Sequence, residues 1–124
     1  MEKRNEILII DDDSKNIFAL SAVLKSKNYS CISAVNAYQG LKILSADKNI
    51  GVVLMDMMMP DMDGYEAINR MKNDEKLKDI PVIAVTAQAR VGDREKCLKA
   101  GADGYISKPV NVDELLRLLN KIIS

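Results

Sequence analysis

Residues 7–13 read Ile-Leu-Ile-Ile-Asp-Asp-Asp, a short and largely β-branched apolar run that ends abruptly in three acids. Apolar runs of similar length recur along the chain. They are Cys31–Val35, Gly51–Met55 and Pro81–Val85, with a weaker one at Gly104–Ile106. Continuous apolar runs of four to five residues are typical of strands that are buried on both faces of a parallel sheet.

Amphipathic helical patterns lie between these runs. Asp13 is expected to cap the first helix, and Asn111 with Glu114 forms a capping-box-like start for the last one. A further helix is expected over Asp93–Ala100, ended by Gly101. The apolar positions that share one helix face are Ile17, Leu20 and Leu24; Leu41 and Leu44; Tyr65, Ile68 and Met71; and Val112, Leu115, Leu116, Leu119, Ile122 and Ile123.

The pattern is therefore strand followed by helix, five times over. This alternation predicts an α/β fold with parallel strands, right-handed crossovers and helices on both faces of the sheet. The length predicts a single domain over residues 1–124. In open sheets of this kind, ligands bind beyond the carboxyl ends of the strands.

Composition excludes several function classes. The chain has 18 basic and 18 acidic side chains, so a direct nucleic-acid binder with a basic face is not expected. It contains no histidine, which excludes histidine-based catalysis, histidine-ligated zinc and a phosphohistidine carrier role. Cys31 and Cys97 are expected to be buried free thiols in a reducing compartment. With no signal or membrane-spanning stretch, we expect a cytoplasmic protein that does not engage a membrane.

Polar side chains follow the ends of four predicted strands. They are Asp11 and Asp12, Asp56, Thr86 and Lys108. Each one alone has an ordinary role as a cap or a solvated side chain, but all of them in this order are far more specific. Three carboxylates in one place repel by about 4 kcal/mol per pair at 4 Å and an effective dielectric near 20, so they need a cation. Oxygen ligands without histidine or thiolate indicate Mg²⁺, which also binds phosphate oxygens.

A carboxylate beside such an ion can itself act as a nucleophile and form an aspartyl phosphate. Phosphoryl transfer depends mostly on positioning and on neutralising charge. Lys108 would neutralise the phosphoryl oxygens together with the metal, and Thr86 could donate a hydrogen bond to one of them. The sequence therefore indicates a phosphoryl-accepting site.

Four motifs carry a resemblance to a known family. They are Ile7-Leu-Ile-Ile-Asp-Asp-Asp13, Val53-Leu-Met-Asp-Met-Met-Met-Pro-Asp-Met-Asp-Gly64, Pro81-Val-Ile-Ala-Val-Thr-Ala87 and Gly101-Ala-Asp-Gly-Tyr-Ile-Ser-Lys-Pro109. Together they resemble the receiver domain of two-component response regulators over essentially the whole chain. The resemblance implies a flavodoxin-like (βα)₅ fold with strand order 2-1-3-4-5.

The resemblance also assigns roles in the site. Asp56 would be the phosphoacceptor, modified to 4-aspartylphosphate. Asp12 would bind Mg²⁺ directly and Asp11 largely through water, with Asp56 and the backbone carbonyl of Met58 as further ligands; Mn²⁺ is an alternative ion. Thr86 and Lys108 would bind the phosphoryl group.

Other residues would govern switching and lifetime. Tyr105 matches the aromatic side chain that turns inward on activation, with Thr86 as its partner in the switch. Lys108-Pro109 matches a peptide bond that is commonly cis. Three residues would flank the site and affect how fast the phosphoryl group is lost: Asp13, Met58 and Gln88.

The resemblance implies a signalling role. A histidine kinase or phosphotransfer protein would donate the phosphoryl group. The surface made by the fourth helix, fifth strand and fifth helix would then bind a downstream effector. The domain could also form a phosphorylation-dependent homodimer. The domain would catalyse its own phosphorylation and slow autodephosphorylation, without turnover of a separate substrate. An alternative is the receiver module of a hybrid histidine kinase, acting as a phosphorelay intermediate, although Met1 and a last helix close to Ser124 favour a stand-alone protein. A phosphorylation-independent docking domain would predict a damaged acidic site.

Two local motifs have competing interpretations. Asp61-Met-Asp-Gly64 resembles the start of an aspartate-nucleophile phosphatase motif, but Pro60 argues against a strand directly before it. A turn into the next helix, with Gly64 for backbone freedom, is favoured instead. The methionines at 55, 57, 58 and 59 are expected to pack in the core and the loop rather than bind a soft metal.

Overall fold

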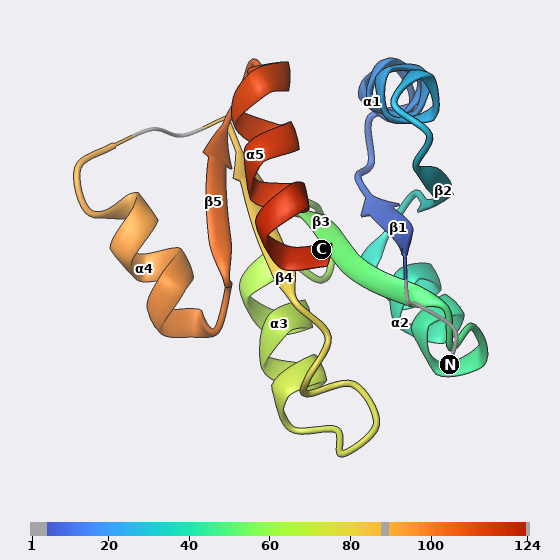
Figure 1. Cartoon of the computed structure of the whole chain (residues 1–124). Helices are drawn as coiled ribbons and strands as arrows, with labels where there is room; N and C mark the ends of the chain where they lie inside the picture. Colours follow the sequence, from blue (N-terminus) through green and yellow to red (C-terminus); the bar gives the residue numbers. More distant parts are fainter. Residues whose placement is uncertain (1–4, 88–89, 124) are drawn as a thin grey trace.

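The computed structural model describes residues 5–87 and 90–123. Within them, strands and helices alternate along the chain (Figure 1). The strands form one parallel sheet in the order β2-β1-β3-β4-β5, which confirms the expected architecture. The elements are β1 (Glu6–Ile10), α1 (Ser14–Ser26), β2 (Ser30–Ala34), α2 (Ala37–Ala46), β3 (Ile50–Asp56), α3 (Gly64–Lys72), β4 (Val82–Thr86), α4 (Asp93–Ala100), β5 (Gly104–Ser107) and α5 (Val112–Ile123).

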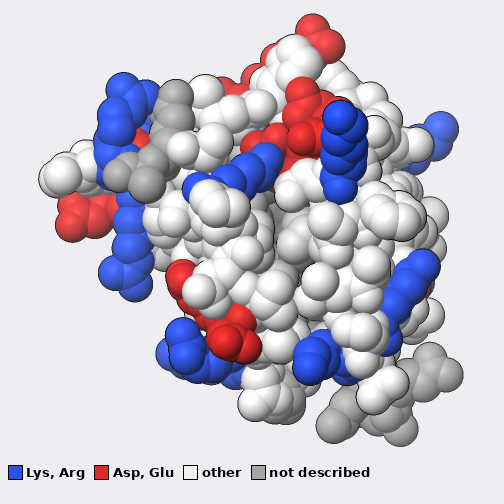
Figure 2. All heavy atoms as spheres, turned by 90° about the horizontal axis from the view of Figure 1, so that it is seen from above, with Lys and Arg blue, Asp and Glu red and all other residues white. Residues whose placement is uncertain are grey.

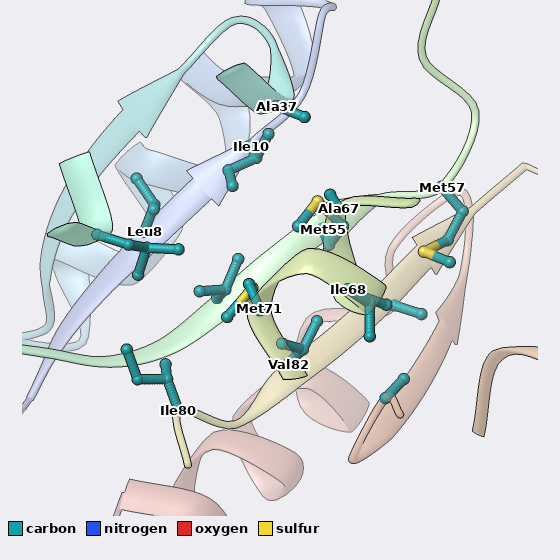
Figure 3. Close-up of a cluster of buried hydrophobic side chains, with 14 of the residues drawn as sticks. Leu8, Ile10, Ala37, Met55, Met57, Ala67, Ile68, Met71, Ile80 and Val82 are labelled. Carbon is teal, nitrogen blue, oxygen red and sulfur yellow. The ribbon is translucent and has the colours of Figure 1, made fainter. Parts of the chain in front are cut away.

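Two cores lie on opposite faces of the sheet, because successive strand residues point to opposite sides. On β1, Ile7 and Ile9 pack in one cluster with the leucines of α1 and α5. Leu8 and Ile10 belong to the other cluster, with α2, α3 and Cys97 of α4. Figure 3 shows this second core, where α3 lies over β3 and β4. The central strands are therefore buried on both faces.

Strand β2 is an exception to the expectation of two buried faces. Ser30 and Ser33 are exposed, and Cys31 and Ile32 are only partly buried. The reason is its place at the edge of the sheet, where it pairs with β1 alone. Cys31 is consequently half-buried, whereas Cys97 is fully buried; both are free thiols.

Side-chain caps begin several helices as expected. The Asp13 carboxylate accepts a hydrogen bond from the Lys15 N–H at the start of α1. Asn111 Oδ1 accepts from the Glu114 N–H at 3.0 Å before α5. Helix α4 ends at Gly101, whose φ of +117° lies in the left-handed region that favours glycine.

Gly64 at the start of α3 serves close packing rather than backbone freedom, which corrects the expectation. A Cβ atom added there would lie 2.7 Å from Met57 Cα and 3.0 Å from the Asp56 carbonyl oxygen. Its N–H donates to the Met57 carbonyl at 3.3 Å. The small residue thus lets α3 begin directly against the end of β3. None of the helices in the described residues has the length and apolar character needed to cross a membrane.

Candidate functional site

The carboxyl ends of the central strands bring three acids together. Asp11 and Asp12 follow β1 directly, and Asp56 is the last residue of the adjacent β3. One carboxylate oxygen from each lies within 4.8 Å of the others. Asp11 is 2% exposed and Asp56 4% exposed, whereas Asp12 is open to solvent. Figure 2, which looks down on this edge of the molecule, shows acidic side chains gathered with lysine or arginine side chains beside them.

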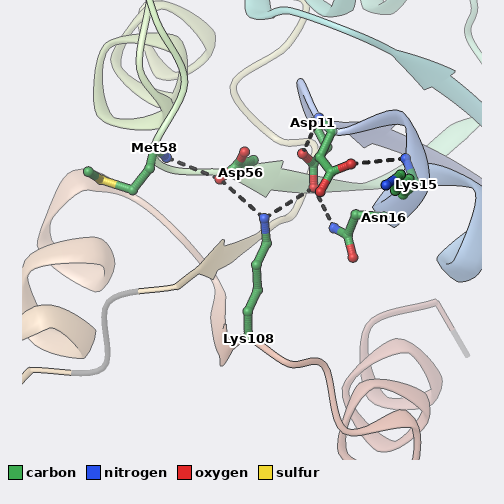
Figure 4. Close-up of polar contacts among 7 residues, drawn as sticks. Asp11, Lys15, Asn16, Asp56, Met58 and Lys108 are labelled. Carbon is green, nitrogen blue, oxygen red and sulfur yellow. Dashed lines mark hydrogen bonds and ion pairs between the residues drawn. The ribbon is translucent and has the colours of Figure 1, made fainter.

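Lys108 reaches this cluster from the loop after β5. Its Nζ lies 3.4 Å from Asp11 Oδ2 and 3.8 Å from Asp56 Oδ1 (Figure 4). The backbone N–H of Lys108 donates a hydrogen bond to the Thr86 carbonyl at 2.8 Å, which holds the loop against the end of β4. The Lys108-Pro109 bond is cis, as the resemblance implied. The lysine is therefore shared between two carboxylates and bound closely by neither.

The backbone after each strand also contacts the acids. The Asp13 N–H donates to Asp11 Oδ1 at 2.9 Å, and the Met58 N–H donates to Asp56 Oδ1 at 3.1 Å. The Met58 side chain is 52% exposed, while its methionine neighbours at 55, 57 and 59 are buried in the core. Packing thus accounts for those three methionines, as expected, but not for Met58.

The pKa of Asp56 reflects both its burial and the charges around it. Burial raises the pKa of its carboxyl to about 7, and the negative charge of Asp11 acts in the same direction. The Met58 N–H and the Lys108 ammonium lower the pKa and offset part of this effect. A bound cation would favour the charged carboxylate that a nucleophile requires.

Asn16 is a site residue that the sequence analysis missed. Its side-chain amide donates a hydrogen bond to Asp11 Oδ2, the oxygen that also faces Lys108 (Figure 4). It lies in the first turn of α1, five residues after Asp11. The available signal was an amide on the helix turn that directly follows the acidic run, but a lone asparagine there is ordinary.

The two expected switch residues lie on the neighbouring strands β4 and β5. Thr86 ends β4 and is 4% exposed. Tyr105 is partly buried on β5 and packs against the core on the side of α3 and α4. There, the Tyr65 hydroxyl is 3.6 Å from Cys97 Sγ, and Lys96 Nζ lies 4.6 Å from the centre of the Tyr65 ring. Gln88, which was expected to flank the site, lies outside the described residues.

The donor set fits a hard divalent cation. Its protein ligand atoms are carboxylate oxygens, and the described residues contain no histidine. Asp12 is exposed and gives an ion access from solvent, while Asp11 and Asp56 are buried. Together, the parallel α/β sheet, the acidic cluster and the nearby ammonium define a class of domain that accepts phosphoryl groups on a carboxylate.

Comparison with known proteins agrees with this class. Residues 7–120 match the response regulator receiver domain family. Two-component response regulator ORR3 of Oryza sativa subsp. indica is 30% identical over 122 residues, covering 98% of this chain and 93% of the rice protein. Polar-differentiation response regulator DivK of Brucella anthropi is 31% identical over 117 residues, or 94% of each protein. The chain therefore belongs to the response regulator receiver domain family, and its function lies in two-component signal transduction.

Solved structures of receiver domains are also similar. The receiver domain of sensor histidine kinase PA1611 from Pseudomonas aeruginosa, determined with a magnesium ion in its active site cleft, has a TM-score of 0.87 and 34% identity over 96% of this chain and 97% of that one. The Saccharomyces cerevisiae receiver domain of Ssk1, solved in complex with the phosphotransfer protein Ypd1, has a TM-score of 0.87 at 22% identity, covering 99% and 91% of the two chains, and shares the fold.

Proposed function

We propose that Asp56 accepts a phosphoryl group from a phosphohistidine on a histidine kinase or phosphotransfer protein. The observation that carries this proposal is the placement of Asp56, buried at the end of β3 with Asp11, Asp12 and Lys108 around it. We further propose that residues 1–124 act as a single receiver domain in the cytoplasm.

In the transfer step, an Asp56 carboxylate oxygen forms a bond to phosphorus as the phosphorus–nitrogen bond of the donor breaks. The imidazole leaves with the electron pair of that bond. Lys108 pairs with one phosphoryl oxygen, and the Thr86 hydroxyl donates a hydrogen bond to another. In autodephosphorylation, a water oxygen forms a bond to phosphorus as the bond between phosphorus and the Asp56 oxygen breaks, which restores the carboxylate and releases inorganic phosphate. The domain thus catalyses changes on its own side chain.

Mg²⁺ is the proposed cofactor, with Mn²⁺ as a substitute. The protein ligands would be Asp12 directly, Asp11 largely through water, Asp56 and the backbone carbonyl of Met58. The ion supplies charge neutralisation for the phosphoryl oxygens. The side chains of Asp13 and Met58 would flank the bound group and affect its lifetime.

Phosphorylation would change the surface of α4, β5 and α5. We propose that Thr86 moves toward the phosphoryl group and that Tyr105 fills the space behind it. Helix α4 is suited to move because Cys97 is its one fully buried residue and its first turn lacks a side-chain cap. Leu98 of α4 and the preceding Val91 are exposed and offer apolar contacts for an effector or for a second copy of the chain.

The central test is phosphorylation by acetyl phosphate, a small phosphoryl donor, in the presence of Mg²⁺. We expect one phosphoryl group per chain on Asp56, measured by intact-protein mass spectrometry and peptide mapping. Asp56→Asn should abolish it, because an amide is a poor nucleophile. Undiminished labelling of Asp56→Asn at another residue would overturn the assignment.

A phosphorelay module of a hybrid histidine kinase is the second candidate. The observation in its favour is the 34% identity to the receiver domain of a sensor histidine kinase, similar to the identity with response regulators. The two functions differ in where the phosphoryl group goes next. Rapid transfer from phosphorylated Asp56 to a histidine phosphotransfer protein would favour the relay, whereas phosphorylation-dependent binding of an effector would favour the regulator.

A further inference from the structure

The Asp11 carboxylate is held by donors from three parts of the chain. The Asp13 N–H donates to Oδ1 at 2.9 Å from the loop after β1. The Asn16 side-chain amide donates to Oδ2 from α1, and Lys108 Nζ approaches the same oxygen from the loop after β5 (Figure 4). Asp11 is 2% exposed, so these protein donors take the place of water.

The two donors to Oδ2 are not equivalent. Lys108 Nζ lies 3.4 Å away, which is long compared with the roughly 2.7–2.9 Å of a good ammonium–carboxylate hydrogen bond. The Asn16 side-chain amide lies within hydrogen-bond distance of the same oxygen. Asn16 therefore satisfies the buried Oδ2 oxygen, and Lys108 is left between Asp11 and Asp56, where its second contact measures 3.8 Å.

The different roles of Asn16 and Lys108 become important when Asp56 receives the phosphoryl group. Lys108 must then turn toward a phosphoryl oxygen and away from Asp11. A buried carboxylate oxygen that loses its last donor carries an uncompensated desolvation penalty. With Asn16 in place, Oδ2 keeps a donor throughout, so the movement of Lys108 leaves no buried acceptor unpaired.

The side-chain amide of Asn16 is also compatible with a cation bound at the acidic cluster, because it is uncharged. An arginine or lysine at position 16 would add a positive charge beside Asp11 and compete with a cation. Asparagine donates a hydrogen bond without adding charge, so the acidic cluster keeps its full attraction for a divalent ion. A hydrogen-bond donor that contacts a metal ligand orients that ligand and affects metal affinity.

We propose that Asn16 is a positioning residue of the phosphorylation site. It holds Asp11 in the orientation that serves the metal, and it frees Lys108 to pair with the phosphoryl group. This inference rests on the proposed function, because it assigns a supporting role at the same site.

The first test measures Mg²⁺ affinity by titration calorimetry. Asn16→Ala should weaken binding by roughly 10-fold, the lower end of the cost of losing a hydrogen-bond partner of a metal ligand. The matched control is Asn120→Ala, the same substitution at an exposed position of α5, which should bind Mg²⁺ like the unaltered protein. Equal Mg²⁺ affinity in Asn16→Ala and Asn120→Ala would overturn the proposal.

The second test reads the hydrogen bond itself by ¹H–¹⁵N NMR. The Asn16 side-chain amide signals, identified by their loss in Asn16→Ala, should be displaced from those of exposed Asn120. They should move toward the exposed-amide position in Asp11→Ala and remain displaced after phosphorylation. Signals that do not respond to Asp11→Ala would show that Asn16 only fills space.

These outcomes are separable from failure of the proposed function. If the unaltered protein failed to bind Mg²⁺ or to acquire a phosphoryl group on Asp56, the proposed function itself would be wrong. If the unaltered protein did both and Asn16→Ala matched it in Mg²⁺ affinity and phosphorylation rate, only the role of Asn16 would be lost.

Discussion

At the scale of single residues, the site concentrates negative charge where water is scarce. Asp11 and Asp56 are both nearly inaccessible, and Lys108 supplies one positive charge for the pair. Burial, together with the negative charge of Asp11, raises the pKa of Asp56. The residues that make the site reactive therefore also make the metal-free protein less stable.

The raised pKa of Asp56 predicts how the stability of the metal-free protein depends on pH. Burial raises the pKa of Asp56 to about 7 in the folded protein, above its value in the unfolded chain. The folded state thus binds the proton more tightly, and stability falls as pH rises from about 4 to about 7. Without Mg²⁺, Asp56→Asn should remove this loss and stabilise the protein above pH 7, by at most about 4 kcal/mol.

Thermal unfolding in a chelator between pH 5 and pH 9 checks the prediction. Asp79→Asn, at an exposed acid in the loop before β4, controls for the change in net charge. A stability gain for Asp56→Asn that is the same at pH 5 and pH 8 would contradict the assigned cause.

At the scale of elements, the join between β3 and α3 depends on close packing. Gly64→Ala would place a methyl group 2.7 Å from Met57 Cα, against backbone that is not free to yield. We expect a loss of about 1–3 kcal/mol in unfolding free energy, typical of overpacking, and slower phosphorylation because Asp56 is displaced. Chemical denaturation and acetyl phosphate labelling would measure the two effects.

Glu66→Ala is the matched control for Gly64→Ala on the same helix. It breaks only the exposed ion pair with Arg70, at 2.7 Å, and should cost less than about 1 kcal/mol. Comparable losses in the two variants would show that the contact with Met57 is relieved by a small shift.

The strands β4 and β5 carry the prediction about signalling. Thr86→Ala should leave Asp56 able to accept the phosphoryl group. It should reduce the phosphorylation-dependent gain in partner affinity, because the variant has no hydroxyl that can move toward a phosphoryl oxygen and donate a hydrogen bond to it. To change the ratio of active to inactive protein from 1:99 to 99:1, the phosphoryl group must interact with the active state about 5.5 kcal/mol more favourably than with the inactive state. Phosphoprotein level and effector affinity are measured in the same samples. A normal gain in affinity would exclude this coupling route.

At the scale of the whole molecule, the acidic cluster links the ends of β1 and β3, which lie at the centre of the sheet. A cation bound there stabilises the fold by mass action, by about 2.7 kcal/mol at 100 times its dissociation constant. We expect Mg²⁺ to raise the melting temperature by several degrees. Asp12→Ala should abolish most of this increase and should melt at a higher temperature than the unaltered protein in chelator.

Asp11→Ala should weaken Mg²⁺ binding less than Asp12→Ala, because its contact is expected through water. Differential scanning calorimetry across a Mg²⁺ series gives both comparisons. Unchanged Mg²⁺-dependent stabilisation in Asp12→Ala would mean that this exposed carboxylate is not a ligand.

Much of this protein was predictable from local sequence, because apolar runs, helical periodicity and the acids after them are properties of neighbouring residues. They predicted the strand–helix alternation, the cap at Asp13 and the glycine end of α4 at Gly101. Strand-end placement also predicted that Asp11, Asp12, Asp56 and Lys108 would meet, since parallel strands end at one edge of a sheet.

Only the tertiary structure decided the rest, because those features depend on partners that are distant in the chain. Because β2 pairs on one side alone, Ser33 is exposed and Cys31 is only partly buried, although their run resembles a buried strand. The need for Gly64 comes from the approach of α3 to Met57 rather than from a turn conformation. Asn16 acquires its role because helix α1 and the loop after β5 both converge on one oxygen of Asp11, a geometry that no local pattern encodes.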